Sequence, residues 1–160
     1  MNTSIFGRQQ DIFFMEQALQ QADAAFKLGE VPIGAVVVNQ YGKIVAQAHN
    51  LVEHEHSQRG HAEMLALDAA GKAQKNWRLD WHWLYVTLEP CSMCMAMIKL
   101  SRVSGIVYAA ASPIYGYRLD NTKQSWVYND EMLVMVTGVK EEESVELMQK
   151  FFQQQRLGQP

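Results

Sequence analysis

The stretch HWLYVTLEPCSMCMAMIKLS, residues 82–101, decides the fold class of this chain. Residues 82–89 are rich in aromatic and β-branched side chains and predict a buried β-strand, whereas residues 91–101 predict a helix. Pro90 lies between them, where we expect a sharp turn. A strand that is followed directly by a helix is typical of sheets with helices packed on their faces. The stretch therefore indicates an α/β fold.

The segments on either side of this stretch alternate between helical and strand patterns in the same way. Alternation after an initial hairpin predicts a mixed, largely parallel sheet of about five strands with helices on both faces. No internal repeat or linker interrupts the chain, so we expect one domain over residues 1–160. The predicted elements are a helix at 11–28, strands at 33–39 and 43–49, a helix at 61–73, a strand at 105–111, a loop with one short helix at 112–130, a strand at 132–139 and a terminal helix at about 140–156.

Composition and charge exclude several classes of protein. The 160 residues are 48% hydrophobic and 19% charged, which is typical of a globular protein and not of a disordered or collagen-like one. Apolar runs such as VPIGAVVV at 31–38 are far shorter than the roughly 20 residues of a membrane-spanning helix, and the N-terminus lacks an apolar signal segment. We therefore expect a cytoplasmic protein. With a net charge of −3, any RNA binding would need a local basic patch.

Cys91 and Cys94 are the only cysteines in the chain, and they begin the helix that follows the buried strand. The positive end of a helix dipole lowers the pKa of a thiol there and favours the thiolate. Two thiolates separated by two residues suit three kinds of site: a dithiol redox couple, half of a closed structural zinc site, or part of a catalytic zinc site. The pair alone does not choose among them.

His61 and Glu63 stand at the start of another predicted helix, in the stretch GHAEMLALDAA at 60–70. If the two helix starts meet at the strand ends, one imidazole and two thiolates become three protein ligands of zinc and leave one position for water. Two residues turn a helix by roughly 200°, so Glu63 should approach that water as a proton shuttle. Taken alone, Glu63 is also explained as a carboxylate that complements the helix dipole.

The other histidines favour ordinary structural roles. EHEH at 53–56 alternates His and Glu outside any predicted helix or strand, and we expect a solvated loop with no metal ligation by His54 or His56. His49 and His82 are expected to be structural or exposed. The methionines at 95 and 97, with Met93, are expected to fill gaps in the core.

The combination H-x-E and P-C-x-x-C, here HAE at 61–63 and PCSMC at 90–94, resembles the signature of the zinc-dependent nucleobase deaminases. From about Phe13 to Arg156 the chain is similar to the bacterial tRNA-specific adenosine deaminases, through GEVPIGAVVV, HAE, LYVTLEPCSMC and the terminal FFQQQR. The resemblance implies a three-layer, cytidine deaminase-like α/β/α sandwich and a homodimer.

The resemblance also implies roles for individual residues. It assigns one Zn²⁺ per chain to His61, Cys91 and Cys94, proton transfer to Glu63, and hydrogen bonding of the target base to Asn50. Asn50 is otherwise explained as a turn residue after the second strand. The implied reaction is hydrolytic deamination of adenosine to inosine at the wobble position of a tRNA anticodon loop. The candidate phosphate contacts are Lys99, Arg102, Lys123, Lys150 and Arg156.

Two segments depart from the family pattern, and two other functions stay open. MAM at 95–97 replaces AGA in the helix after the cysteines, and SPIYGYRLDN at 112–121 replaces a D-x-K-x-G-A segment. The resemblance therefore assigns no contacts to the nucleotides that neighbour the target base. The first alternative is a deaminase of a free base or nucleoside such as guanine or cytosine, which the acidic net charge favours. The second is a dithiol redox protein using Cys91 and Cys94.

Overall fold

The computed structural model describes residues 3–119 and 133–158 of the chain. Within these ranges, five strands form one sheet in the order β2-β1-β3-β4-β5. The elements are α1 (Arg8–Lys27), β1 (Gly34–Val38), β2 (Ile44–His49), α2 (Val52–Glu55), η1 (Gln58–Gly60), α3 (Ala62–Gln74), β3 (Trp83–Leu88), α4 (Ser92–Leu100), β4 (Gly105–Ala110), η2 (Tyr117–Leu119), β5 (Val134–Thr137) and α5 (Glu141–Leu157).

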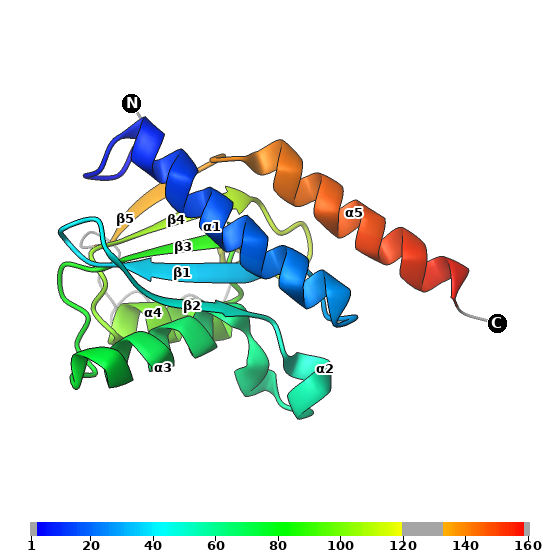
Figure 1. The fold of residues 1–160 in the computed structure, drawn as a ribbon, viewed down its shortest axis with the longest axis horizontal. Coiled ribbons are helices and arrows are strands. Elements are labelled where there is room, and N and C mark those ends of the chain that lie inside the picture. The colour runs from blue at the N-terminus through cyan, green and yellow to red at the C-terminus, as the bar shows by residue number, and fades with distance from the viewer. Residues whose placement is uncertain (1–2, 120–132, 159–160) are drawn as a thin grey trace.

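Helices cover both faces of the sheet, as Figure 1 shows. The helices α1 and α5 lie on one face, and α3 and α4 lie on the other. This arrangement confirms the predicted α/β/α sandwich. Among the described residues, no helix is both long and apolar enough to cross a membrane.

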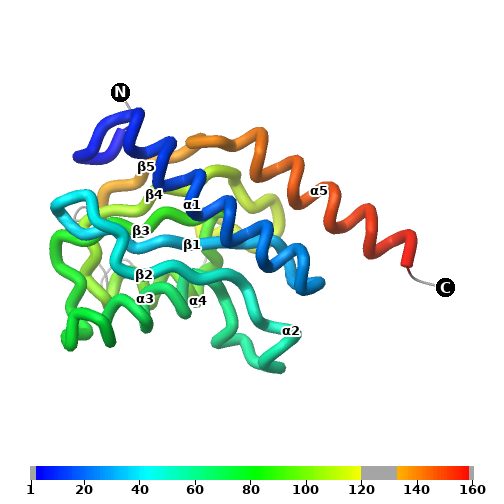
Figure 2. The backbone as a smooth tube through the Cα atoms, in the orientation of Figure 1, coloured from blue at the N-terminus to red at the C-terminus, as the bar shows by residue number. Residues whose placement is uncertain are grey.

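The strands of the sheet do not all run in the same direction. The strand β1 runs antiparallel to both β2 and β3, while β3, β4 and β5 run parallel to one another. The strands β2, β3, β4 and β5 therefore all run in one direction and β1 runs against them, so the sheet is mixed and largely parallel, as predicted. The reason lies in the path of the chain, which Figure 2 traces from β2 through α2 to α3 and β3. Because β1 is the hairpin partner of β2 and lies between β2 and β3, it runs against both of them.

Side chains of β1 alternate between the two cores of the molecule. Ala35 and Val37 pack in the cluster that contains α3 and α4, whereas Val36 and Val38 pack in the cluster that contains α1. All four are fully buried, because successive side chains of a strand point to opposite faces and both faces of this sheet are covered. The continuous apolar run in the strand predicted at 33–39 therefore lies in the interior of the sheet, as expected.

The segment 53–56 was expected to be a loop, and the structure corrects this prediction. The helix α2 includes Glu53 and His54, and the carboxylate of Glu30 accepts hydrogen bonds from their backbone N–H groups at 3.2 and 2.7 Å. Glu30 is 1% exposed and lies far from α2 in the sequence, so the local pattern does not reveal it. His56 ends the helix in the left-handed conformation. The side chains of 53–56 are exposed, as expected.

The remaining predicted elements are present, with small shifts at their ends. The strand predicted at 132–139 is the shorter β5, and the terminal helix predicted at about 140–156 is α5. The short helix expected within 112–130 corresponds to η2 for the part of that loop that the structure describes. Residues 120–130 of the loop, with Lys123, and Met132 of the predicted strand lie outside the described residues.

Candidate metal centre and active site

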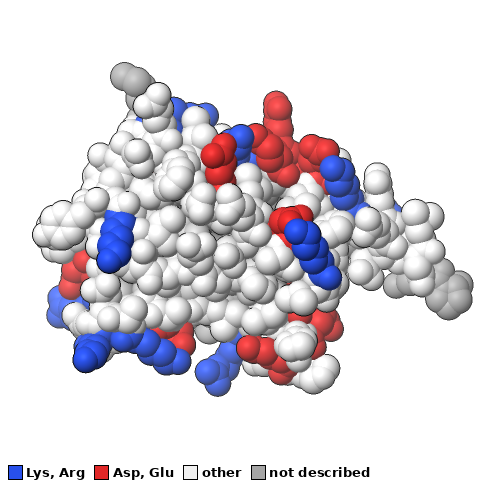
Figure 3. All heavy atoms as spheres, in the orientation of Figure 1, with Lys and Arg blue, Asp and Glu red and all other residues white. Residues whose placement is uncertain are grey.

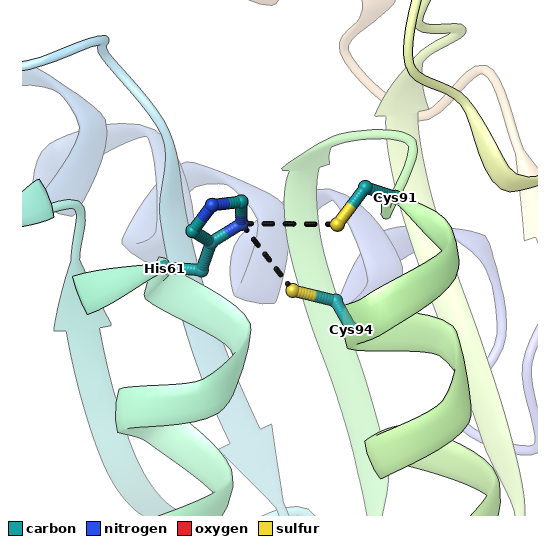
Figure 4. A group of neighbouring side chains, drawn as sticks. All are labelled: His61, Cys91 and Cys94. Atoms are coloured by element: carbon teal, nitrogen blue, oxygen red, sulfur yellow. Dashed lines mark hydrogen bonds between the residues drawn. The ribbon is translucent and has the colours of Figure 1, made fainter. Parts of the chain in front are cut away.

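Two helix starts meet at one edge of the sheet and bring three side chains together. His61 is the N-cap residue of α3, and Cys91 is the N-cap residue of α4. Cys94 lies in the first turn of α4 and is fully buried. Figure 4 shows the imidazole of His61 facing the sulfur atoms of both cysteines. The convergence expected from the sequence is therefore present.

The distances in this cluster fit a metal site. The Nδ1 atom of His61 lies 3.5 Å from Sγ of Cys94 and 3.9 Å from Sγ of Cys91. All three candidate ligand atoms lie within 4.8 Å of one another. One nitrogen and two sulfur atoms are a donor set that zinc prefers, and three protein ligands are typical of a catalytic zinc with an open position. Neither His54 nor His56 belongs to the cluster.

Gln58 on η1 is a further residue of this cluster that the sequence did not reveal. Its side-chain oxygen Oε1 lies 3.2 Å from Nε2 of His61. If Nε2–H donates to this oxygen, the lone pair of Nδ1 faces the two sulfur atoms. Such a partner behind a histidine fixes the orientation of the ring and the tautomer that a metal requires. A glutamine three residues before the histidine is only a weak sequence signal of this contact, because the glutamine side chain reaches the imidazole ring only when η1 forms its turn.

The two thiols have different acidities in the metal-free chain. A hydrogen bond from Cys94 lowers the pKa of Cys91 to about 4, and His61 contributes to this shift, although burial opposes it. Donating that hydrogen bond and being buried raise the pKa of Cys94. The hydrogen bond to Cys91 also raises the pKa of His61, against the effect of burial. The cluster therefore holds protons that a metal ion would displace.

Glu63 lies beside this cluster, inside the protein. The residue is 3% exposed, and burial raises the pKa of its carboxyl group to about 7. Among the described residues, its buried Oε2 atom has no hydrogen-bond partner. Buried polar atoms in folded proteins nearly always have a partner, so this oxygen points to a group that the described residues do not supply. A carboxyl group with a pKa near neutral pH can both accept and donate a proton.

Asn50 connects the end of β2 to the start of α3. The residue is 4% exposed, and its side-chain Oδ1 accepts a hydrogen bond at 3.0 Å from the backbone N–H of Ala62. It is the residue directly after β2, which agrees with the structural explanation of this position. Its proposed contact with a base stays a prediction, and its amide N–H₂ group is the donor that such a contact would use.

Glu89 is a second buried carboxylate that the sequence reading missed. Its side chain is fully buried and accepts hydrogen bonds from the backbone N–H groups of Ser112 and Arg118, at 3.0 and 3.1 Å, and from Nε of Arg118 at 2.8 Å. The backbone N–H of Tyr117 donates to the carbonyl of Pro90 at 2.8 Å. Glu89 thus fixes the divergent segment 112–119 against the start of α4. The only sign of this role in the sequence is the position of Glu89 directly before Pro90 and Cys91.

The candidate RNA contacts do not form one patch in the described part of the chain. Lys99 and Arg102 lie on or just after α4, whereas Lys150 and Arg156 lie on α5, over the opposite face of the sheet. Lys150 pairs with Glu146 at 2.8 Å. Figure 3 shows few charged atoms in the middle of the visible face, and acidic atoms over the start of α5. Lys123 lies outside the described residues.

The remaining histidines and methionines mostly have the structural places expected of them. His49 Nδ1 lies 2.9 Å from the Gln21 side-chain oxygen, and His82 Nδ1 lies 2.9 Å from the carbonyl of Asp80. Met95 is buried in the core, and the partly buried Met97 packs against it. Met93 is the exception to the expected core packing, because it is 39% exposed on the outer side of α4.

The chain is similar to known proteins at three levels: a family model, a relative in sequence and solved structures. The family model for the cytidine and deoxycytidylate deaminase zinc-binding region matches residues 8–110, which include the three clustered side chains. The chain is 46% identical over 149 residues to a protein of Bacillus subtilis (strain 168) named tRNA-specific adenosine deaminase. That alignment covers 92% of this chain and 91% of the relative.

Solved structures share the fold over most of the chain. One structure, from a study of A-to-I editing by tRNA:A34 deaminases at the wobble position of transfer RNA, is 34% identical with a TM-score of 0.75, and covers 84% of this chain and 98% of its own. Another, a guanine deaminase from Nitrosomonas europaea, has a TM-score of 0.77 at 20% identity and covers 93% of both chains. At that identity the second likeness bears on the fold alone.

Proposed function

Because the chain belongs to the family of cytidine and deoxycytidylate deaminases with a zinc-binding region, we propose that it is a zinc-dependent hydrolase that converts adenosine to inosine at the wobble position of a tRNA anticodon. The observation that carries the proposal is the meeting of His61, Cys91 and Cys94 beside a buried carboxylate, one oxygen of which has no hydrogen-bond partner within residues 3–119 and 133–158. The names of the similar proteins support adenosine in tRNA as the substrate.

In this proposal His61, Cys91 and Cys94 hold one zinc ion per chain. Zinc, when bound, supplies a Lewis acid that makes water a nucleophile near neutral pH. Gln58 keeps Nδ1 of His61 directed at the two sulfur atoms. Cys94 must give up its proton, and its burial in the first turn of α4 keeps the resulting thiolate away from solvent.

Glu63 moves the protons of the reaction. Its Oε2 accepts a proton from the attacking water and passes it to the ring nitrogen next to the carbon that carries the amino group. The hydroxide that remains from the water attacks that carbon through its oxygen and forms a carbon–oxygen bond. Glu63 then takes the second proton of the water and delivers it to the amino group, the carbon–nitrogen bond breaks, and ammonia leaves. Adenosine and water thus give inosine and ammonia, and a pKa of about 7 suits Glu63 to both directions of transfer.

Asn50 and the segment 112–119 would form the surroundings of the base. Asn50 is fixed by its bond to Ala62, so its N–H₂ group is held ready to donate to an acceptor on the base. Glu89 holds the segment 112–119 beside Pro90, which keeps one wall of the site in place. Moving a base out of its stack and into the site costs roughly a few kcal/mol of stacking free energy, and this cost is lower in a single-stranded loop.

We also propose that the protein acts in the cytoplasm as a homodimer. The family resemblance supports the dimer, and so do exposed apolar side chains on the outer side of α4, where Met93 is 39% and Leu100 is 56% exposed. Apolar patches of this kind are typical of contact surfaces. Sedimentation of the purified protein would measure the state directly, and a monomer at micromolar concentration would contradict it.

A deaminase of a free base is the second candidate function. One observation favours it: the four described candidate RNA contacts lie on opposite faces of the sheet. The discriminating experiment incubates the zinc-loaded protein separately with an anticodon stem-loop that carries a wobble adenosine, with free adenosine, with guanine and with cytosine. Inosine in the stem-loop, with ammonia released in equal amount, is the expected result. Turnover of a free base with an untouched stem-loop would overturn the RNA substrate and leave the zinc chemistry in place.

A further inference from the structure

Two tryptophans lie on the surface at the end of α3 that is opposite to the metal centre. Trp77 is 65% exposed and Trp81 is 67% exposed. Tryptophan carries a large apolar ring, and leaving such rings in water forfeits the free energy of their burial. Two exposed rings within five residues therefore require an explanation beyond the folding of this chain.

The turn that carries the rings is firmly attached to the core. Leu79, between them, is 1% exposed, and its backbone N–H donates to the carbonyl of Ser101 at 2.8 Å. The backbone N–H of Trp81 donates to the hydroxyl of Ser104 at 3.1 Å, and Trp81 has a left-handed φ of 66°. A non-glycine residue in that conformation is uncommon and is held there by its surroundings. The turn thus keeps both rings on the outside.

Two arginines lie near one of the two rings, that of Trp77. The guanidinium carbon of Arg78 lies 5.8 Å from the ring centroid of Trp77, and that of Arg102 lies 5.9 Å from it. Lys75 ends α3 nearby and is exposed. We call Lys75, Trp77, Arg78, Trp81 and Arg102 the tryptophan patch. Asp80 pairs with Arg78 at 3.1 Å and is the acidic residue within the turn, so the patch is cationic in a protein whose net charge is −3.

Helix dipoles explain only part of this arrangement. Cations near the C-terminal ends of α3 and α4 interact favourably with the negative ends of the two dipoles, which accounts for Lys75 and Arg102. It does not account for two exposed indole rings beside them. Exposed aromatic rings between cations are the combination that binds unpaired nucleotides, because the rings stack on bases and the cations contact phosphates.

We propose that the tryptophan patch is a second RNA contact, which holds the backbone and an unpaired nucleotide of the same RNA whose adenosine enters the metal centre. The inference rests on the proposed function. The helix α3 separates the two sites, and its thirteen residues span about 20 Å at 1.5 Å per residue. Basic atoms along the lower left of Figure 3 lie over this end of α3. An isolated anticodon hairpin has unpaired nucleotides only in its loop, which the metal centre occupies, so the nucleotide that the patch holds lies elsewhere in the tRNA, and the patch adds affinity for a whole tRNA rather than for the hairpin.

The test compares the affinities of two RNAs. Zinc-loaded protein is titrated with a full-length tRNA that carries a wobble adenosine and with its isolated anticodon hairpin, and the ratio of the two dissociation constants is measured. The Trp77→Ala variant should lose about tenfold of the preference for the full-length tRNA, because a stacking contact is removed. Trp77→Phe should keep most of it. The Arg78→Gln/Arg102→Gln double variant should bind full-length tRNA with a weaker salt dependence. The slope of the logarithm of the binding constant against the logarithm of the salt concentration should fall by up to about two, about one for each phosphate contact that is lost.

Matched controls come from α1, on the opposite face of the sheet. Phe13→Ala removes another exposed ring and Arg8→Gln another exposed arginine, and neither should change the ratio. Unfolding temperature and zinc content confirm that each variant is folded.

An unchanged ratio in Trp77→Ala, with full-length tRNA still bound and deaminated, would overturn the patch and leave the proposed function standing. A shift of oligomeric state in Trp77→Ala without a change in RNA affinity would make the patch a protein contact and overturn it as well. Failure of the unaltered protein to bind either RNA would instead overturn the proposed function and the patch with it.

Discussion

The two ends of the helices α3 and α4 carry opposite chemistry. At their N-terminal ends lie His61, Cys91 and Cys94, with the carboxyl group of Glu63 buried beside them. At their C-terminal ends lie the exposed rings and cations of the tryptophan patch. The same pair of helices thus carries a site of partly or fully buried, proton-exchanging groups at one end and a solvent-exposed, permanently charged surface at the other.

This difference follows from the helix dipole and from burial. The positive ends of both helices favour thiolates, the hydrogen bond from Cys94 lowers the pKa of Cys91 to about 4, and burial raises the pKa of Glu63 to about 7. The negative ends favour cations, which keep their charge in water. Substitutions at the first end should therefore change metal binding and chemistry, whereas substitutions at the second should change affinity and leave the chemical step alone.

The largest effect is expected from removal of a sulfur ligand. Cys94→Ala leaves two candidate ligands, which is too few for a catalytic zinc, so both the zinc and the activity should be lost completely. Metal analysis of the purified variant measures the first and inosine formation the second. His54→Ala is the control, since His54 is an exposed histidine outside the cluster and should retain both. One zinc per chain in purified Cys94→Ala would remove this residue from the ligand set.

A smaller but still large effect is expected at Glu63, which tests whether the buried carboxyl group acts in chemistry or in binding. Glu63→Gln has nearly the same shape but cannot exchange protons, so it should keep its zinc and lose roughly 10²- to 10⁴-fold in turnover. Glu142→Gln, an exposed position on α5, is the matched control and should show full turnover. Loss of zinc in Glu63→Gln would show that the residue is a ligand or is required for folding.

Zinc affinity should depend on pH at the buried end of the helices. The pKa of Cys94 is raised, so Cys94 is protonated at neutral pH in the metal-free chain and must lose that proton to bind the metal. Cys91, with a pKa of about 4, is already deprotonated. As the pH falls, the proton on Cys94 competes with zinc, and the raised pKa of His61 adds a second competitor. Affinity should therefore fall at least about tenfold per pH unit between pH 8 and pH 6. Chelator competition at each pH measures this, and a flat profile would contradict it.

The smallest effects concern stability and contrast a buried carboxylate with an exposed one. Glu89→Ala leaves two backbone N–H donors, those of Ser112 and Arg118, without their acceptor, and should lower the free energy of unfolding by about 1–3 kcal/mol. Lys72→Gln breaks an exposed ion pair with Asp68 and should cost at most about 0.5 kcal/mol. Denaturant unfolding of both variants measures the difference. Equal losses would mean that Glu89 does not fix the segment 112–119.

Much of the fold and of the site could be predicted from the sequence, because the signals are local. The periodicity of residues 82–101 places a strand and a helix on either side of Pro90, and α4 begins where the cysteines stand. Helix starts that follow strand ends gather at one edge of a sheet, so the approach of His61 to Cys91 and Cys94 could be expected before the structure was known. The position of the divergent segment 112–119 could not, since it depends on hydrogen bonds to Glu89, which is distant in the sequence.

The errors arose where distant residues supply the partners. The helix α2 was missed because its first N–H groups bond to Glu30, which precedes it by more than twenty residues. The mixed, largely parallel sheet was predicted correctly, but the position of β1 between β2 and β3, where it runs against both, was not predicted. The local pattern of apolar and polar residues reports burial and periodicity, but it does not report which strand lies beside which.

The sequence by itself therefore determined the order of the elements, the residue types of the metal centre and the family of the chain. These features depend on short spacings, such as the two residues between Cys91 and Cys94, that any fold of this type must preserve. Only the tertiary structure decided that Oε2 of Glu63 is buried with no hydrogen-bond partner in the part of the chain that the structure describes, and that Gln58 contacts Nε2 of His61. It alone also decided that Arg102 lies over Trp77. The reason is physical: desolvation and contacts between side chains depend on distances in space, and those distances arise only when the sheet and its helices pack together.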